Sequence, residues 1–276
     1  MKSPRWLFAI LFGTVLALVP STVSMASPST VTAQAAADAG DSVSGAPRTS
    51  TPPPPQSLCD PGAPPNAPQT TAFYNNNALF GPLNLPTASP VGPLLAGYQR
   101  FGAQSESEWL KNYTVPATST TPVRLFFPPQ NGYVLGPDGK AAKTRQTLLP
   151  GYRLDRFGFT GGTFLSPIGT AFNARSLPPQ NLSTPPFPPD TAPAPLANYH
   201  TYCILKPFSV DSGSIAPWFA QPGGGTQFEL NQAYFPQATT TVTVQWLIDH
   251  KFITEEYLDG TCVDQDGWAA PSGACS

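Results

Sequence analysis

Three parts of the sequence combine residue types that can contact a ligand. Residues 153–158 (RLDRFG) lead into 164–170 (FLSPIGT), residues 199–207 begin YHTY and end in Lys206-Pro207, and residues 216–227 contain Gly223-Gly224-Gly225. Because glycine has no Cβ, a triple glycine lets backbone approach a ligand closely and offers consecutive N–H groups to an anion or a carbonyl. Glycine-rich turns are also common without a ligand, so this pattern alone leaves both interpretations open.

Short strands are expected to position these segments. Apolar or alternating runs bounded by Pro and Gly predict strands at 123–127, 147–149, 199–207 and 226–230. Along the third run, His200 and Lys206 would face one side and Thr201 and Cys203 the other. The Pro-rich residues 177–197 are predicted to be a loop.

Two helices are predicted from their start signals. Ser105 and Glu108 form a capping box before an apolar pair, which predicts a short helix ending near Asn112. Thr243 is a candidate cap for a helix over residues 244–250. The expected fold class is α+β, mainly β: a twisted antiparallel sheet with few short helices, plus a small N-terminal helical or irregular region.

The chain divides into five parts by composition. Residues 1–26 have a positive start, an apolar run too short to span a bilayer, and a small-x-small cleavage site, which predicts a secretory signal peptide rather than a membrane anchor. Residues 27–56 are predicted to be a disordered Pro/Ser/Thr-rich linker. We expect a small region at 57–121 without its own core, a globular domain at 122–258 and an acidic tail at 259–276.

The cysteine count fits an exported protein. Cys59, Cys203, Cys262 and Cys275 predict two disulfides, for which three connectivities exist. A local Cys262–Cys275 clip is plausible, and Cys59 would then pair with Cys203. Sequons at Asn112 and Asn181 are possible N-glycosylation sites. The absence of a C-x-x-C pair argues against zinc and thioredoxin-like chemistry.

Charge excludes another class of function. The formal net charge is -2, and no run of Lys and Arg occurs beyond the start of the chain. Because strong sequence-independent nucleic-acid binding needs clustered Lys and Arg, we expect no nucleic-acid partner, and no membrane partner either.

Six motifs in the same order resemble the tuberculosis necrotizing toxin (TNT) domain family. They are GYQRFG, PPQNGY, LLPGYRLDRFG, FLSPIGTAFNARSLPP, YHTYCILKPF and APWFAQPGGGTQF, within about residues 97–253. In layout the chain is most similar to the secreted fungal surface NADases of this family. The resemblance implies a metal-free hydrolase that cleaves the nicotinamide–ribose bond of NAD+ and NADP+.

The resemblance also implies residue roles. Arg156 matches the family's active-site arginine and Gln227 its catalytic glutamine, while His200 matches a histidine of the cleft. Arg156 would then hold the diphosphate and Gln227 would orient the ribose and water. Further substrate contacts are expected at six positions: Phe164 and Trp218 as walls, Gly224, Gly225, Thr226 and Lys206.

Each of these residues also has a structural interpretation. Arg156 could form an ion pair with Asp155, Gln227 could cap a turn, and His200, Trp218 and Phe164 could be core residues. An ADP-ribosyltransferase and a non-catalytic nucleotide-binding surface protein are the alternative functions. By resemblance, Glu255 and Glu256 are the best candidates for a structural calcium site, against a solvated acidic surface. A homodimer formed through residues 57–121 is a further expectation.

Overall fold

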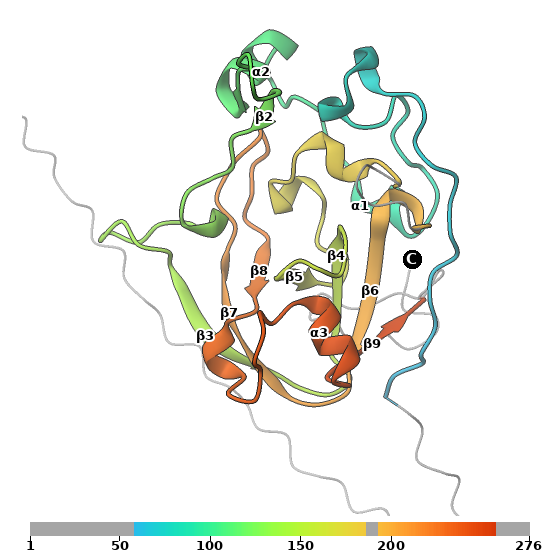
Figure 1. The fold of residues 1–276 in the computed structure, drawn as a ribbon, viewed down its shortest axis with the longest axis vertical. Helices are drawn as coiled ribbons and strands as arrows, with labels where there is room; N and C mark the ends of the chain where they lie inside the picture. Colours follow the sequence, from blue (N-terminus) through green and yellow to red (C-terminus); the bar gives the residue numbers. More distant parts are fainter. Residues whose placement is uncertain (1–57, 186–192, 258–276) are drawn as a thin grey trace, which may run out of the picture. The chain divides into compact units, whose positions relative to one another are not determined.

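The computed structural model describes residues 58–185 and 193–257 (Figure 1). The predicted signal peptide, linker and acidic tail, with Cys262 and Cys275, lie outside these residues. Within the part described, no helix has the length and apolar character needed to cross a membrane.

An antiparallel sheet of seven strands positions the rest of the chain. Its strands follow the order β3-β7-β8-β5-β4-β6-β9. Their bounds are β3 (Lys143–Leu148), β4 (Arg153–Phe157), β5 (Phe164–Pro167), β6 (Tyr199–Ile204), β7 (Phe208–Ser214), β8 (Thr226–Glu229) and β9 (Ile253–Glu256). The predicted fold class is confirmed, and the predicted strands at 147–149, 199–207 and 226–230 overlap β3, β6 and β8, while the one at 123–127 contains β2 (Arg124–Leu125) of a separate hairpin.

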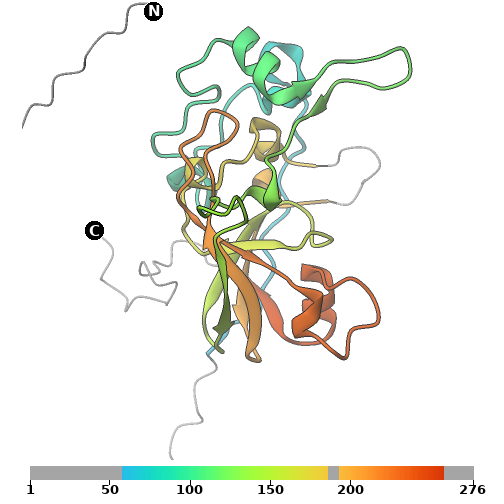
Figure 2. The ribbon, with the colours of Figure 1, turned by 90° about the vertical axis from the view of Figure 1, so that its left-hand side faces the viewer.

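Helix α3 (Val244–Asp249) covers one face of the sheet near β4, β5 and β8 (Figures 1 and 2). Thr243 caps it by accepting the Trp246 N–H, as predicted. Val244 and Leu247 are fully buried against apolar side chains of the strands, among them Leu154, Leu165, Tyr202, Ile204 and Phe228. This contact is the main core of the domain.

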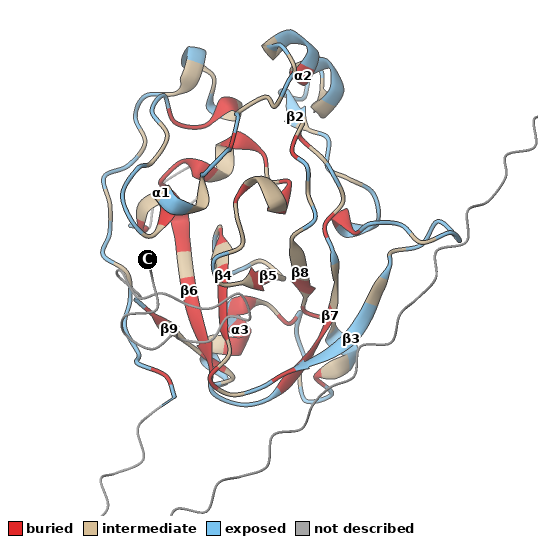
Figure 3. Cartoon of the chain, turned by 180° about the vertical axis from the view of Figure 1, so that it is seen from behind, coloured by how far each residue is buried: buried red, intermediate tan, exposed pale blue. Residues whose placement is uncertain are grey.

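A second core cluster lies at the end of β4 and the start of β6. Phe157 and Tyr199 pack there against Phe172 and Leu182, together with Val91 of α1 (Val91–Leu94). The chain between β5 and β6 is irregular, with short 3-10 helices η4 (Asn173–Arg175), η5 (Pro179–Leu182) and η6 (Leu196–Asn198). The described part of residues 177–197 contains short 3-10 helices and no strand, which agrees with the loop predicted there. Figure 3 shows buried residues along β4 and β6, whereas β3 is mostly exposed.

The N-terminal region packs on the sheet domain through aromatic side chains. It contains η1 (Tyr74–Asn76), η2 (Ala78–Phe80), α2 (Glu106–Tyr113), a hairpin of β1 (Thr114–Val115) and β2 (Arg124–Leu125), and η3 (Gln130–Gly132); η7 (Gln232–Tyr234) follows β8. The predicted capping box of α2 is present. Phe80 and Trp109 are fully buried with Phe219, whose carbonyl accepts from the Trp109 indole at 3.1 Å. The predicted homodimer stays a prediction.

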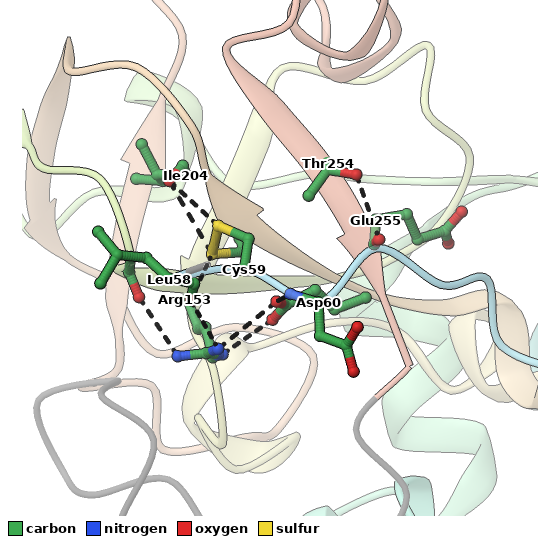
Figure 4. Close-up of a disulfide and its surroundings, with 10 residues drawn as sticks. Leu58, Cys59, Asp60, Arg153, Ile204, Thr254 and Glu255 are labelled. Atoms are coloured by element: carbon green, nitrogen blue, oxygen red, sulfur yellow. Dashed lines mark hydrogen bonds and ion pairs between the residues drawn. A yellow bond between two sulfur atoms is a disulfide. The ribbon is translucent and has the colours of Figure 1, made fainter. Parts of the chain in front are cut away.

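The first described residues are fixed to the sheet edge formed by β9 (Figure 4). Cys59 forms a disulfide with Cys203 of β6, in agreement with the pairing thought plausible from the sequence. Arg153 lies beside it and donates to Glu256 at 2.8 Å and to the Leu58 carbonyl at 3.2 Å. The Gly62 N–H donates to the Glu255 carbonyl at 3.0 Å, so residues 58–62 cover the edge of the sheet.

Candidate functional site

A cleft of 640 Å³ lies where β4 ends. Its walls are Arg156 and Phe157, glycines of the β4–β5 loop, and polar side chains from η5 and η6 that include Gln180, Asn181 and Asn198. Arg156 is the single charged residue among those that line it. An anion entering this cleft would therefore meet one cation and several neutral hydrogen-bonding groups.

Arg156 is a half-buried cation held by main-chain carbonyls. Its Nε donates to the Phe159 carbonyl at 2.8 Å and its Nη1 to the Phe164 carbonyl at 2.6 Å. Within the described ranges no carboxylate forms an ion pair with it, and its Nη2 has no hydrogen-bond acceptor. Burial lowers the pKa of Arg156, but from so high an ordinary value that it stays charged.

The glycines of the β4–β5 loop make room for this guanidinium. A Cβ at Gly162 would overlap Arg156 Nη2, and one at Gly158 would lie 3.4 Å from the same atom. Gly158 also has a φ of 127°, which side-chain-bearing residues rarely adopt. The spacing of arginine and glycine in RFGFTGG therefore has a steric cause.

Asp155 does not pair with Arg156, so that interpretation of the sequence is wrong. It points to the opposite face of β4 and forms a fully buried ion pair with Arg175 at 2.7 Å. Burial raises the pKa of Asp155, while Arg175, the Tyr199 hydroxyl and the Gly169 N–H act in the opposite direction. Arg175 Nε also donates to the Thr170 carbonyl at 2.9 Å, so the pair holds the 168–176 loop in place. The sequence analysis did not single out Arg175.

Gln227 and Arg156 line one cavity, although they come from strands separated by β5. Alternation along the strands places the two residues on opposite faces of the sheet. The β4–β5 ladder ends at the Asp155–Ser166 pair, and beyond it Arg156, Phe164 and Gln227 line a small cavity of 50 Å³. The small cavity shares the lining residues Arg156 and Phe157 with the cleft.

A third cavity, of 270 Å³, shares the lining residues Phe164 and Gln227 with the small cavity. It is lined by Phe164 and Gln227, by the turn at Asn131 and Gly132, and by the rings of Phe127 and Phe219. Gln227 Nε2 donates to the Asn131 carbonyl at 2.9 Å. Burial raises the pKa of the neighbouring Tyr133 to about 12, and a hydrogen bond with Gln227 works against this rise. Phe164 thus lines two of the three cavities, where an aromatic wall was expected.

His200 lies behind the cleft rather than on its surface. It is the cross-strand partner of Arg156, and Asn198, which does line the cleft, accepts a hydrogen bond from its Nε2 through Oδ1 at 2.9 Å. Its Nδ1 lies 2.5 Å from Glu255 Oε1. His200 is therefore half-buried in a hydrogen-bonded row and lines none of the three cavities.

Trp218 does not form a wall of the cavities. Its indole N–H donates to the Phe126 carbonyl at 2.8 Å and its ring packs against Tyr113 and Phe126. The adjacent Phe219 occupies the wall instead. The sequence could not separate these neighbours, because both are large aromatics in a turn.

The triple glycine does not offer its N–H groups to a ligand. The N–H groups of Gly223, Gly224 and Gly225 donate to carbonyls of Asn173, Ile215 and Ala174, in that order. A Cβ at Gly225 would lie 2.8 Å from the Ala174 carbonyl oxygen, so this glycine permits close packing of two loops. Thr226 pairs with Ser214 in the sheet. The predicted substrate contacts of Gly224, Gly225 and Thr226 are therefore absent from these cavities.

Lys206 lies away from the cleft. It follows the end of β6, six residues beyond His200, which is about 20 Å along an extended chain. Its Nζ donates to the His250 carbonyl at 3.2 Å, at the end of α3. Lys206 lines none of the three cavities, and its predicted phosphate contact stays a prediction.

Glu255 and Glu256 do not fit a shared calcium site. They are consecutive residues of β9, so their side chains leave opposite faces, and each already has a partner. Glu256 is fully buried against Arg153 and the Asp60 N–H, and Glu255 contacts His200. In the described ranges the one close group of potential metal ligands is Cys59, Cys203 and Glu256, and its two cysteines form the disulfide.

The two sequons differ in surroundings. Asn112 is exposed on α2, whereas Asn181 is half-buried in the wall of the cleft and its Ser183 is buried. Glycosylation of either residue stays a prediction.

Comparison with known proteins agrees with the arrangement of the motifs. Residues 147–255 match the family model described as tuberculosis necrotizing toxin. The conidial surface nicotinamide adenine dinucleotide glycohydrolase nadA of Aspergillus fumigatus is 40% identical over 165 residues, covering 58% of this chain. The chain matches 65% of the length of that relative.

Two solved structures are also similar. Tuberculosis necrotizing toxin complexed with its immunity factor has a TM-score of 0.37 and 19% identity, covering 66% of this chain and 78% of the other. Rhs1-CT in complex with its cognate immunity protein RhsI1 has a TM-score of 0.26 and 13% identity, covering 43% and 80%. Residues 147–255 are therefore similar to the tuberculosis necrotizing toxin family.

Proposed function

We propose that the protein is a secreted NAD+ glycohydrolase, which hydrolyses the nicotinamide–ribose bond to give nicotinamide and ADP-ribose. NADP+ is proposed as a second substrate. The observation that carries this proposal is the half-buried cation of Arg156, which lines a 640 Å³ cleft without a carboxylate partner in the described chain. The similarity to a relative named as an NAD glycohydrolase supports it.

Hydrolysis of the nicotinamide–ribose bond does not require two acidic side chains, and the cavities are lined by a cation and by amide side chains instead. The nicotinamide nitrogen of NAD+ is cationic, so the ring leaves as a neutral base and needs no proton. The barrier lies in forming an oxocarbenium-like ribose, which water then attacks. The one carboxylate that lines the three cavities, Asp155, is buried and paired with Arg175, so the two-carboxylate arrangement of most glycosidases has no counterpart here.

We propose different roles for Arg156 and Gln227 in the reaction. Arg156 would hold the diphosphate, because its Nη2 is available in the cleft while Nε and Nη1 fix the group to the β4–β5 loop. Gln227 would orient the ribose and the attacking water with its amide dipole. Preorganised dipoles of this kind contribute roughly 3–4 kcal/mol to transition-state stabilisation.

Secretion to the cell surface or medium is part of the proposal. It rests on the signal peptide predicted at residues 1–26 and on the Cys59–Cys203 disulfide, which is typical of exported proteins. The relative from Aspergillus fumigatus is named as a conidial surface protein.

Hydrolysis of etheno-NAD+ by the purified protein tests the proposal. We expect a fluorescent product from the wild type and a loss of kcat of roughly 100- to 1000-fold in Gln227→Ala. Arg156→Ala should lose activity mainly through a higher KM. Lys206→Ala is the matched control and should keep full activity, since Lys206 lies beyond the far end of β6.

Three results would overturn the proposal or its site. Full activity of both Gln227→Ala and Arg156→Ala would remove the site assignment. Transfer of labelled ADP-ribose to a protein before free ADP-ribose appears would replace hydrolysis by ADP-ribosyl transfer. Binding of NAD+ by the wild type without turnover would leave a nucleotide-binding surface protein.

A further inference from the structure

A polar network on β7 and β8 reaches the Gln227 carboxamide, and the proposed chemistry makes no use of it. Asn131 accepts the Gln227 N–H through its main-chain carbonyl, at 2.9 Å. The Asn131 side-chain amide donates to Glu229 Oε1 at 2.7 Å, two residues along β8 from Gln227. Glu229 Oε2 in turn lies 2.8 Å from Lys143 Nζ. Gln227, Asn131 and Glu229 therefore form a closed arrangement around the end of β8.

We propose that Asn131 and Glu229 are positioning residues, which aim the carboxamide oxygen of Gln227 into the cavity where the ribose and water would meet. This inference rests on the proposed NAD+ glycohydrolase function.

The acceptor at Asn131 determines which end of the carboxamide faces the cavity. A carbonyl oxygen can accept only from the NH2 group, so Nε2 must point to Asn131. Oε1 is then the end of the carboxamide left for the cavities that Gln227 lines, where Tyr133 is its one other hydrogen-bonding neighbour among the described residues. A group held this way is an acceptor suited to a ribose hydroxyl or a water molecule.

The position of the Asn131 carbonyl depends on Glu229. Gln130, Asn131 and Gly132 have φ values of 51°, 57° and 81°, so three consecutive residues occupy the left-handed region. This conformation is unfavourable for residues with a side chain, and asparagine tolerates it better than most. The turn also forms part of the cavity wall. Its contact with Glu229 fixes the turn to the same strand that carries Gln227.

Lys143 keeps Glu229 in the required orientation. It lies between two carboxylates, at 2.8 Å from Glu229 and 2.9 Å from Asp211. One oxygen of Glu229 is thus directed to Lys143, which leaves the other for Asn131. Asp211 is held at the far side by Tyr234 at 2.7 Å and Asn231 at 2.9 Å.

A donor–acceptor exchange between Asn131 and Glu229 tests the inference. Asn131→Asp places a carboxylate against Glu229, and the two should repel. Adding Glu229→Gln restores the hydrogen bond with reversed direction, because the introduced amide can donate to the introduced carboxylate. For Asn131→Asp we expect kcat to fall on the order of 10- to 100-fold while KM changes little, since Arg156 and the cleft are untouched.

The double variant Asn131→Asp/Glu229→Gln should recover most of the lost kcat. Simple structural damage at two adjacent sites would add instead, so this rescue separates positioning from destabilisation. Tyr234→Phe is the matched control: it removes a hydrogen bond at the far side of the same network and should leave kcat unchanged. Thermal melts of all variants verify that each is folded at the assay temperature.

Three results would contradict the inference while leaving the proposed function intact. They are wild-type kcat in Asn131→Asp, an equal loss in Tyr234→Phe, or no recovery in the double variant, each with an active wild type and an inactive Gln227→Ala. A wild type that does not hydrolyse NAD+ would instead remove the proposed function, and this inference with it.

Discussion

Arg156 is stabilised by dipoles rather than by an opposite charge. Two carbonyls accept from its guanidinium, and the described chain places no carboxylate beside it. A half-buried cation without an ion-pair partner has lost part of its hydration, which is unfavourable. The cost falls when an anion binds, so the site is predisposed to a ligand that brings negative charge. This is the physical basis for assigning the diphosphate of NAD+ to the cleft.

Gly162→Ala tests whether the Arg156 guanidinium needs the space that the absence of a side chain at Gly162 leaves. The added Cβ would overlap Arg156 Nη2, so the side chain must leave its two carbonyls. We expect activity to fall at least about tenfold, mainly in kcat/KM, because the cation that binds the diphosphate is displaced. Steady-state kinetics with etheno-NAD+ measure the effect.

Gly161→Ala is the neighbouring control. A Cβ there meets nothing within 4 Å, so the protein should fold as the wild type does and keep its kcat. Equal kinetics for the two alanine variants would show that Arg156 does not need the space at Gly162.

At the scale of elements, β9 is an edge strand that the N-terminal segment protects. Exposed edge strands offer unpaired N–H and C=O groups to other chains, and covering them is a common solution. Residues 58–62 perform this role, fixed by the disulfide to β6 and by the Arg153–Glu256 pair beneath (Figure 4). The same strand carries Glu255, which contacts His200 behind the cleft. The segment therefore supports the site indirectly.

Replacing both Cys59 and Cys203 by alanine tests the contribution of this attachment. The disulfide joins residues separated by 144 positions, so it restricts a large loop of the unfolded chain. We expect the free energy of unfolding to fall by about 2–4 kcal/mol, with little change in KM. Urea unfolding monitored by tryptophan fluorescence provides the measurement. An unchanged midpoint would mean that Arg153 and Glu256 suffice to hold the segment.

Strands with a clear apolar pattern could be predicted from the sequence, whereas strands with buried charges could not. β6 and β8 carry aromatic and apolar side chains on a buried face, and both were predicted. β4 buries Arg153 and Asp155, because each has a partner from a distant segment, Glu256 and Arg175. β7 similarly buries Asp211. The pattern of residue types along a sequence does not show which charged residues from distant segments form ion pairs. β4 and β7 were therefore not predicted as strands.

The candidate site likewise contains residues that the sequence indicated and residues whose surroundings it could not show. Arg156, Phe164 and Gln227 line connected cavities, and the motif resemblance had indicated all three. The sequence could not show that the glycine N–H groups and Lys206 donate to main-chain carbonyls, because acceptors such as those of Asn173 and His250 lie far away in sequence. One signal for Asn131 was present: Asn-Gly is a strong turn pair, and Asn131-Gly132 lies within a shared motif.

For the whole molecule, charge is scarce and concentrated in buried pairs. Charged residues make up 11% of the chain, yet Arg153–Glu256, Arg175–Asp155 and the Lys143–Asp211–Glu229 group are all largely buried. Exposed ion pairs contribute little to stability, but breaking a buried pair leaves an unpaired charge inside the protein. The stability of the fold should therefore depend on each of these groups keeping all of its partners.

The pKa of Asp211 predicts how the stability of the fold changes with pH. Burial raises its pKa, but hydrogen bonds from Tyr234, Lys143 and Asn231 outweigh burial and hold the pKa below the ordinary value. A carboxyl whose pKa is lower in the folded than in the unfolded state stabilises the fold above about pH 4, its ordinary pKa. That stabilisation is lost as the pH falls through the depressed folded-state value.

The difference in unfolding free energy between the wild type and Asp211→Asn isolates this effect. The difference should be large and constant from about pH 5 to 7, then shrink below about pH 4, because protonation removes from the wild type what the variant already lacks. Urea unfolding at a series of pH values measures it. Asp138→Asn is the control, since Asp138 is exposed in a surface pair with Lys140 and its difference should stay near zero throughout. A gap between wild type and Asp211→Asn that widens on acidification would mean that burial, not hydrogen bonding, dominates at Asp211.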